Sequence, residues 1–246
     1  MKRFVILGSA NAVPKVGQDN AHLLIAGNEK IVMVDCGDNP VKVTEAGFSI
    51  LEVTDLVLTH FHADHVGSLP LLIMDMWLEK RTTPLVIHGL KVTLDKSIQL
   101  LELFGWKDWA NLFPVEFNTI DAAGADGFIT DSGMRISALP VVHLVPTIGI
   151  RVESEQGRII AYSCDTEPCP NVLRLAGGAD VLLQESAGLA KGHTSPEQAG
   201  EIATAAGVSK LVLIHYDNRV AESELLGAAR EKFSGEVLLA KDLMVI

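Results

Sequence analysis

The sequence predicts an α/β protein in which two sheets pack together and helices cover their outer faces, a four-layer αββα sandwich. Short apolar or β-branched runs bounded by turn residues, which are typical of strands, occur in both halves of the chain. Apolar residues spaced three and four apart, which are typical of helices, follow such runs in each half. No fixed-period repeat or long Ser/Pro/Gly linker interrupts the 246 residues, so we expect one domain spanning residues 1–246.

The first half begins with strand signals and continues with helix signals. Strands are expected at residues 3–7, 21–26, 30–35 and 55–60. An apolar face at helical spacing then predicts a helix that ends near Lys80, and the members of this face are Leu69, Leu72, Ile73, Met76 and Trp77. A second helix is expected at residues 94–104.

The second half repeats this order of strands and helices. Strands are expected at residues 134–140, 148–153, 158–163, 180–185 and 210–215, with closing strands within residues 236–246. Helices are expected at residues 195–206 and 221–233. Because strands are interspersed with helices in both halves, two packed sheets with outer helices explain the pattern best.

Composition and charge exclude several classes of protein. With 48% hydrophobic residues the chain is long enough to bury a core, so disorder is excluded. The net charge of -11 disfavours binding of long nucleic acids, which requires clustered Lys and Arg. The apolar runs are far shorter than the roughly 20 residues of a membrane span, and the N-terminal run is too short for a secretion signal. Three cysteines do not make a disulfide framework, which favours reduced thiols in a cytoplasm. Together with the short apolar runs, this predicts a soluble, cytoplasmic protein without membrane contact.

The segment Thr59–Gly67 concentrates metal-binding side chains directly after an expected strand. It contains His60, His62, Asp64 and His65. In an extended or turning segment His60 and His62 can point to the same side, while Asp64 and His65 begin the next turn and can face a neighbouring ion. The spacing therefore suits two adjacent divalent ions better than one. Imidazoles with a carboxylate favour zinc, with manganese or iron as alternatives.

The pattern His-x-His-x-Asp-His resembles the signature of the metallo-β-lactamase superfamily. The resemblance implies an αββα sandwich with a dinuclear metal site, a homodimer, and three further ligands that each end an apolar run: His143, Asp165 and His215. The implied ligands of one ion are His60, His62 and His143, those of the other are Asp64, His65 and His215, and Asp165 bridges both.

Other stretches are more specifically similar to ribonuclease Z and its short relatives. They are Leu7–Ala10, Val34–Gly37, Asp64–Pro70 and Gly192–Ser195. By this resemblance His193 matches the proposed proton donor of that family. Glu185 matches the glutamate of the family's His-Glu-Ala-Thr stretch, whose histidine is absent here, and we expect it to orient His193.

Two departures argue against processing of tRNA. Residues 144–164, between His143 and Asp165, leave room for a hairpin instead of the long arm with which ribonuclease Z holds tRNA. The chain is also acidic, whereas a tRNA-binding surface is basic. We therefore expect a small phosphodiester, or another small ester, as substrate.

The resemblance implies metal-assisted hydrolysis through a hydroxide that bridges the ions. Asp64 is available to orient this hydroxide, and His193 is available to protonate the leaving oxygen. The alternatives are a lactonase, thioesterase or other ester hydrolase on the same site, a tRNA 3′-end endonuclease, an iron-dependent redox protein, and a metal-bound binding protein without turnover.

Overall fold

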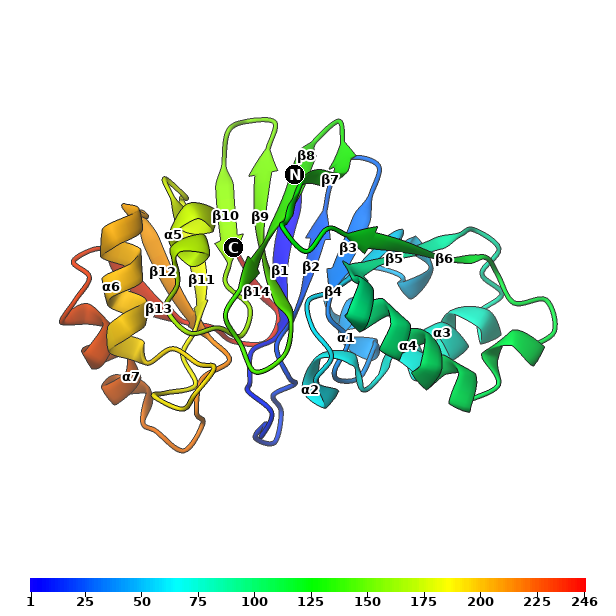
Figure 1. Ribbon diagram of the computed structural model, residues 1–246, viewed down its shortest axis with the longest axis horizontal. Coiled ribbons are helices and arrows are strands. Elements are labelled where there is room, and N and C mark those ends of the chain that lie inside the picture. The colour runs from blue at the N-terminus through cyan, green and yellow to red at the C-terminus, as the bar shows by residue number, and fades with distance from the viewer.

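Two mixed sheets of seven strands each form the centre of the molecule, and helices lie on their outer sides (Figure 1). The computed structural model describes residues 1–246. Helices α3 and α4 lie on the side of the first sheet, and α5, α6 and α7 lie on the side of the second. The αββα arrangement predicted from the sequence is therefore confirmed.

The first sheet has the strand order β14-β1-β2-β3-β4-β5-β6. Its strands are β1 (Arg3–Gly8), β2 (His22–Ala26), β3 (Ile31–Val34), β4 (Asp55–Leu58), β5 (Leu85–Leu90), β6 (Val115–Ile120) and β14 (Met244–Val245). Strands β14 to β3 pair antiparallel, and β3 to β6 pair parallel.

The second sheet has the strand order β13-β12-β11-β10-β9-β8-β7. Its strands are β7 (Ala125–Asp131), β8 (Met134–Val141), β9 (Thr147–Ser154), β10 (Ile159–Tyr162), β11 (Val181–Glu185), β12 (Lys210–Ile214) and β13 (Glu236–Leu239). Strands β7 to β10 pair antiparallel, and β10 to β13 pair parallel. Strands β8, β10, β11 and β12 therefore run in the same direction, and their carboxyl ends meet at one edge of the sheet.

The helices are short, and none of them is long and apolar enough to cross a membrane. They are α1 (Val41–Glu45), α2 (Ala63–Val66), α3 (Leu69–Leu78), α4 (Lys91–Leu103), α5 (Pro170–Ala176), α6 (Pro196–Ala206) and α7 (Glu222–Arg230), with 3₁₀ turns η1 (Ile50–Glu52) and η2 (Trp106–Asp108). Helix α6 begins where expected because Ser195 and Gln198 form a reciprocal capping box.

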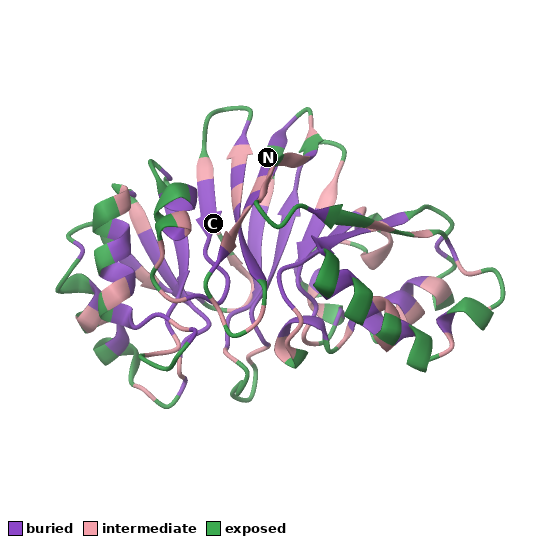
Figure 2. Cartoon of the chain, viewed as in Figure 1, coloured by how far each residue is buried: buried purple, intermediate pink, exposed green.

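Strand β1 shows why the sheets need cover on both faces. Phe4 and Ile6 join the apolar core that contains residues of both sheets, whereas Val5 and Leu7 join the core shared with helix α3. Alternate side chains of one strand thus enter different cores, so the strand is apolar throughout. Figure 2 shows the result as buried strands between helices that are exposed on their outer faces.

Three strands that the sequence analysis did not predict, β5, β6 and β7, complete the two sheets. Strand β6 ends the first sheet and β7 ends the second. Both carry exposed polar residues between apolar ones, and β7 also contains Gly127, so neither has the apolar run of a central strand. Strand β5 passes directly into α4 at Lys91 without a turn residue between them.

A buried polar cluster connects β4 and β5 at a distance from the edge described above. Asp55 lies 2.8 Å from His88 Nε2 and 2.9 Å from Lys30 Nζ, and Asn118 Nδ2 donates to His88 Nδ1 at 3.1 Å. Burial alone would raise the pKa of Asp55, but the hydrogen bonds from His88 and Lys30 outweigh it and hold this pKa below its usual value of 3.8.

Asp55→Asn is expected to lower the free energy of unfolding by about 2–3 kcal/mol at pH 7, because the amide no longer supplies the negative charge that His88 and Lys30 contact in the folded protein. The folded-state pKa lies below the unfolded one, so this contribution is present above the unfolded pKa and is lost as pH falls through the folded pKa. Urea unfolding at pH 7 and pH 3 measures both effects. The control is Asp95→Asn on the exposed face of α4. An Asp55→Asn deficit that is as large at pH 3 as at pH 7 would contradict the prediction.

Candidate metal centre

Seven side chains from both sheets converge where the carboxyl ends of the strands meet. His60 and His62 follow β4, and Asp64 and His65 lie in the first turn of α2. The others follow strands of the second sheet: His143 after β8, Asp165 after β10 and His215 after β12. The structure thus brings together all seven residues that the family resemblance implied as ligands.

Left-handed backbone turns at the strand ends redirect the chain toward this cluster. Asp35, Cys164 and His215 have φ values of 62°, 53° and 52°. A non-glycine residue in this region costs about 1–3 kcal/mol and persists at functional sites. Strands β3, β10 and β12 therefore end one residue earlier than the sequence predicted, since the residues that follow leave the ladder. Strand β4 ends two residues earlier than predicted, at Leu58.

The first group of donor atoms consists of three imidazoles. His62 Nδ1 lies 3.0 Å from His60 Nε2 and 3.2 Å from His143 Nε2. Burial lowers the pKa of all three rings, most strongly for His60. Neutral imidazoles with lone pairs that face one point are the ligands a divalent metal ion requires.

The second group contains His65, His215 and Asp64, and Asp165 lies between the two groups. His65 Nε2 is 3.6 Å from Asp64 Oδ2 and 3.6 Å from Asp165 Oδ1. His215 Nε2 is 3.4 Å from both Asp64 Oδ2 and Asp165 Oδ2. Asp165 Oδ2 also lies 3.8 Å from His143 Nε2 in the first group.

Three atoms of these seven side chains are buried without a hydrogen-bond partner, namely His65 Nε2, Asp165 Oδ1 and His215 Nδ1, and the first two lie 3.6 Å apart. Buried polar atoms are rarely left unpaired, because desolvation is costly. A cation between His65 Nε2 and Asp165 Oδ1 would supply the missing partner of both atoms, and the cluster is therefore suited to hold divalent metal ions.

Neighbouring groups fix which nitrogen of His65 and of His143 faces the cluster. The buried carboxylate of Asp35 accepts hydrogen bonds from His65 Nδ1 at 2.8 Å and from Thr59 N and Oγ1 at 2.8 and 2.7 Å. His143 Nδ1 donates to the Gly192 carbonyl at 2.7 Å. No role of Asp35 was predicted from the sequence, although Asp35 directly follows an apolar run, as several of the predicted ligands do.

Asp35→Asn is expected to weaken metal binding by about 10–100-fold. The neutral amide is a weaker acceptor for the Nδ1–H of His65 than the carboxylate is, so it orients the ring less firmly. Competition with a metal-chelating dye measures the affinity. Asp38→Asn, three residues further along the same loop, is the matched control and should keep wild-type affinity. Unchanged metal affinity in Asp35→Asn would show that this carboxylate does not tune the centre.

His193 lies beside the cluster and is hydrogen-bonded to Glu185. His193 Nδ1 is 3.0 Å from Glu185 Oε1, and the His193 ring stacks on His215 with 5.7 Å between centroids. Burial raises the pKa of Glu185, while the hydrogen bond to Glu185 raises that of His193. Glu185 Oε1 also accepts from the backbone N–H groups of Thr166 and Thr194. The structure thus places together the two residues that the sequence singled out for proton transfer.

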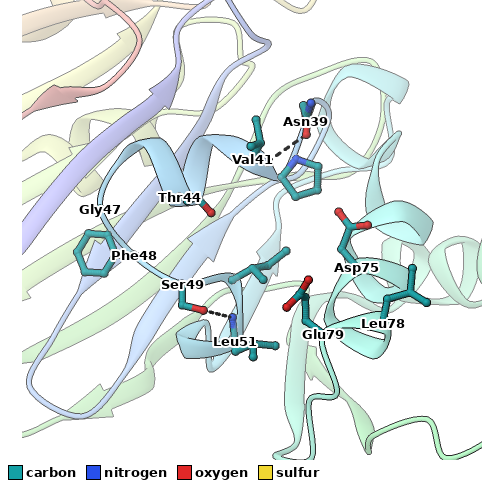
Figure 3. Close-up of a pocket in the computed structure, with 12 residues that line it drawn as sticks. Asn39, Val41, Thr44, Gly47, Phe48, Ser49, Leu51, Asp75, Leu78 and Glu79 are labelled. Atoms are coloured by element: carbon teal, nitrogen blue, oxygen red, sulfur yellow. Dashed lines mark hydrogen bonds between the residues drawn. The ribbon is translucent and has the colours of Figure 1, made fainter.

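A cavity of about 720 Å³ lies away from this cluster, between α1, η1 and α3 (Figure 3). Figure 3 shows Asp75 of α3 and Glu79 at its C-terminal end on one wall, and Thr44 and Phe48 on the other. None of the seven clustered residues lines it, so the site is located by its donor atoms and not by cavity volume.

The αββα sandwich carries at one edge a His/Asp cluster that can hold divalent metal ions, and this combination defines the class of protein as metal-binding. Over residues 32–216 the sequence matches the family described as beta-lactamase superfamily domain, and the chain belongs to this family. The superfamily resemblance expected from the sequence is thereby confirmed.

Curated relatives over the full length are ribonucleases Z. That of Methanothermobacter thermautotrophicus is 26% identical, and the alignment covers 100% of this chain and 96% of the relative. That of Mycobacterium sp. (strain KMS) is 28% identical over 99% of this chain and 95% of the relative.

Solved structures share the fold. The metallo-beta-lactamase fold protein YhfI from Bacillus subtilis matches with a TM-score of 0.82 and 21% identity over 99% of this chain and 98% of its own. The short form of human tRNase Z (ELAC1) matches with a TM-score of 0.78 and 21% identity over the same shares. The fold of this chain is therefore the metallo-β-lactamase fold.

Proposed function

We propose that the protein is a zinc-dependent phosphodiesterase that hydrolyses small or short phosphodiesters at a centre of two ions. The observation that carries the proposal is the division of the donor atoms into two groups that share Asp165. His60, His62 and His143 would hold one ion, Asp64, His65 and His215 the other, and Asp165 both. Zinc fits nitrogen-rich sites of this kind, with manganese or iron as alternatives.

Two divalent ions, when bound, supply an activated water at neutral pH and offset negative charge on the attacked centre. The chain itself orients the reactants. Asp64 is the more exposed carboxylate of the cluster, with 15% of its side chain accessible against 3% for Asp165. Asp64 is therefore placed to accept a hydrogen bond from an attacking water and to aim it at the substrate.

The pair of His193 and Glu185 supplies the proton for the leaving group. Because Nδ1 of His193 bonds to Glu185, Nε2 is left for the substrate. A ring nitrogen of His193 lies within 4.8 Å of a carboxylate oxygen of Asp165 and of a ring nitrogen of His215. A positioned acid matters most for an alkoxide leaving group, which favours phosphodiester cleavage over thioester cleavage. The relatives named ribonuclease Z support the same class of bond.

The surroundings of the centre favour a small substrate. Between His143 and Asp165 the chain forms the hairpin of β9 and β10, with a turn at residues 155–158, so no extended arm is present there. Exposed aliphatic side chains flank the site: Val142 and Leu144 beside His143, and Leu189 on the loop before His193. Apolar side chains and a net charge of -11 suit a small substrate better than a long polyanion.

Protein stripped of metal with a chelator and reloaded with zinc, manganese or iron tests the proposal. The expected result is turnover of a chromogenic phosphodiester that is lost on stripping and returns with two zinc ions per chain. Turnover of a lactone or thioester alone would replace the proposed reaction class. Tight binding and cleavage of a precursor tRNA at physiological salt would contradict the small-substrate part, and no turnover with two ions bound would overturn the proposal.

The homodimer and the cytoplasmic location belong to the same proposal. Cys36 and Cys164 are buried free thiols and Cys169 is also free, which suits a reducing compartment. Sedimentation velocity of the zinc-loaded protein tests the dimer, and a monomer at micromolar concentration would contradict it.

A further inference from the structure

Gly192 lies between the metal cluster and the proposed acid. Its carbonyl accepts the hydrogen bond from His143 Nδ1, and its own N–H donates to Glu167 Oε1 at 2.8 Å. Its φ is +86°, and an added Cβ would lie 2.9 Å from His143 Nδ1. Only glycine fits this position, because the loop backbone lies directly against the ligand ring.

Glu167 is itself firmly anchored beside the same ligand. Its backbone N–H donates to the carbonyl of Val142 at 2.7 Å, and the two residues form an isolated β-bridge next to His143. Glu167 also follows Asp165 by two positions. The carboxylate thus extends from a fixed point near two proposed ligands.

The loop that Glu167 holds has few other attachments. Within residues 188–192, Gly188 N–H bonds to the Thr194 carbonyl and the Ala190 carbonyl accepts from His193 N–H, both at 3.1 Å. These bonds join residues 188–192 to the two residues that follow, His193 and Thr194, which are themselves bonded to Glu185. Within residues 188–192, Gly192 alone bonds to other segments, through Glu167 and His143. Removal of the Glu167 carboxylate would therefore leave the ring of His143 as the one contact of this kind to residues 188–192.

We propose that Glu167 is a positioning residue that sets the geometry of His143 and His193 together. By holding the Gly192 N–H, it directs the Gly192 carbonyl at His143 and fixes the next residue, His193, at the edge of the cluster. The part that concerns His193 rests on the proposed function. The part that concerns His143 is a statement about metal binding and needs no substrate.

Glu167→Ala and Glu167→Gln test this role against a merely structural one. In Glu167→Ala we expect zinc affinity to fall by about 10–100-fold, as for other groups that orient metal ligands, and kcat to fall by about 10-fold or more while KM changes little. Glu167→Gln keeps a carbonyl oxygen that accepts a hydrogen bond from the Gly192 N–H. It is expected to retain most of the wild-type zinc affinity and most of the wild-type kcat. Calorimetric titration with zinc and steady-state kinetics measure these values.

The Nδ1 proton of His143 gives a readout without turnover. In zinc-loaded protein its NMR signal is expected to exchange slowly in wild type and Glu167→Gln, and faster in Glu167→Ala. Glu197→Ala is the matched control, since the Glu197 carboxylate accepts a hydrogen bond from Ser195 Oγ, three residues after Gly192, and does not bond to Gly192 or His143. It should change neither this signal nor zinc affinity.

Unchanged zinc affinity and proton exchange in Glu167→Ala would overturn the inference even if phosphodiesterase activity is found. If Glu167→Ala binds zinc more weakly and exchanges the His143 Nδ1 proton faster, while the wild type shows no phosphodiester turnover, the inference is upheld and the proposed function is overturned. Gly192→Ala breaks the same contact from the loop side. Wild-type zinc affinity in Gly192→Ala would therefore overturn the inference even if Glu167→Ala does not fold.

Discussion

Asp165→Asn is expected to lower turnover by about 10³-fold or more and to leave at most one tightly bound ion per chain. The two oxygens of this buried carboxylate face both groups of donors, with Oδ1 3.6 Å from His65 Nε2 in one group and Oδ2 3.8 Å from His143 Nε2 in the other. An amide of the same size keeps the packing but removes the negative charge that both ions would share. Metal analysis after gel filtration and kcat on the best phosphodiester measure the two effects.

The matched control for Asp165→Asn is Asp95→Asn, which makes the same change of charge on the exposed face of α4. It should retain two ions and wild-type kcat. If Asp165→Asn itself kept two tightly bound ions and full turnover, Asp165 would not be the shared ligand and the assignment of two neighbouring ions would fail.

His193→Ala has the second largest expected effect, a fall in kcat of about 10²–10⁴-fold with both ions retained, because it removes only the proton donor. Glu185→Gln should lose less, since the amide oxygen still accepts from His193 Nδ1, which lies 3.0 Å away in the wild type. Lys191→Ala, on the same loop, is the control for loop disturbance and should keep its kcat.

The choice of leaving group separates proton donation from general damage to the site. A nitrophenolate leaves without much help from an acid, whereas an alkoxide needs a proton. The loss in His193→Ala should therefore be small for a nitrophenyl ester and large for an alkyl ester of the same phosphate. An equal loss for both esters, or loss of an ion from the variant, would show that His193 acts otherwise than as an acid.

The sequence located the seven clustered residues because their signals are local. Four lie in one short motif, and His143, Asp165 and His215 each follow an apolar run that becomes a strand. A strand that ends at the same edge as its neighbours delivers the next side chains to a common place. Periodicity was therefore sufficient for the αββα sandwich and the motif for four of these residues, whereas His143, Asp165 and His215 were identified through the family resemblance that the motif carries.

The supporting residues lacked such signals. Glu167 and Gly192 acquire their roles only through hydrogen bonds between segments that are distant in sequence. The left-handed backbone of Cys164 and His215 was equally invisible, because neither residue type prefers that conformation and the surrounding fold imposes it. Contacts of this kind become apparent only when the tertiary structure is known.

The donor atoms come from segments between His60 and His215 and from both sheets, and this has a consequence for the order of assembly. Parallel strand pairings and the packing of one sheet on the other join residues that are far apart in the chain, which makes such topologies slow to fold. A complete set of donors exists only when these steps are finished. If the centre holds two ions as proposed, their tight loading would be a late event in maturation, and it would select chains whose two halves have already docked.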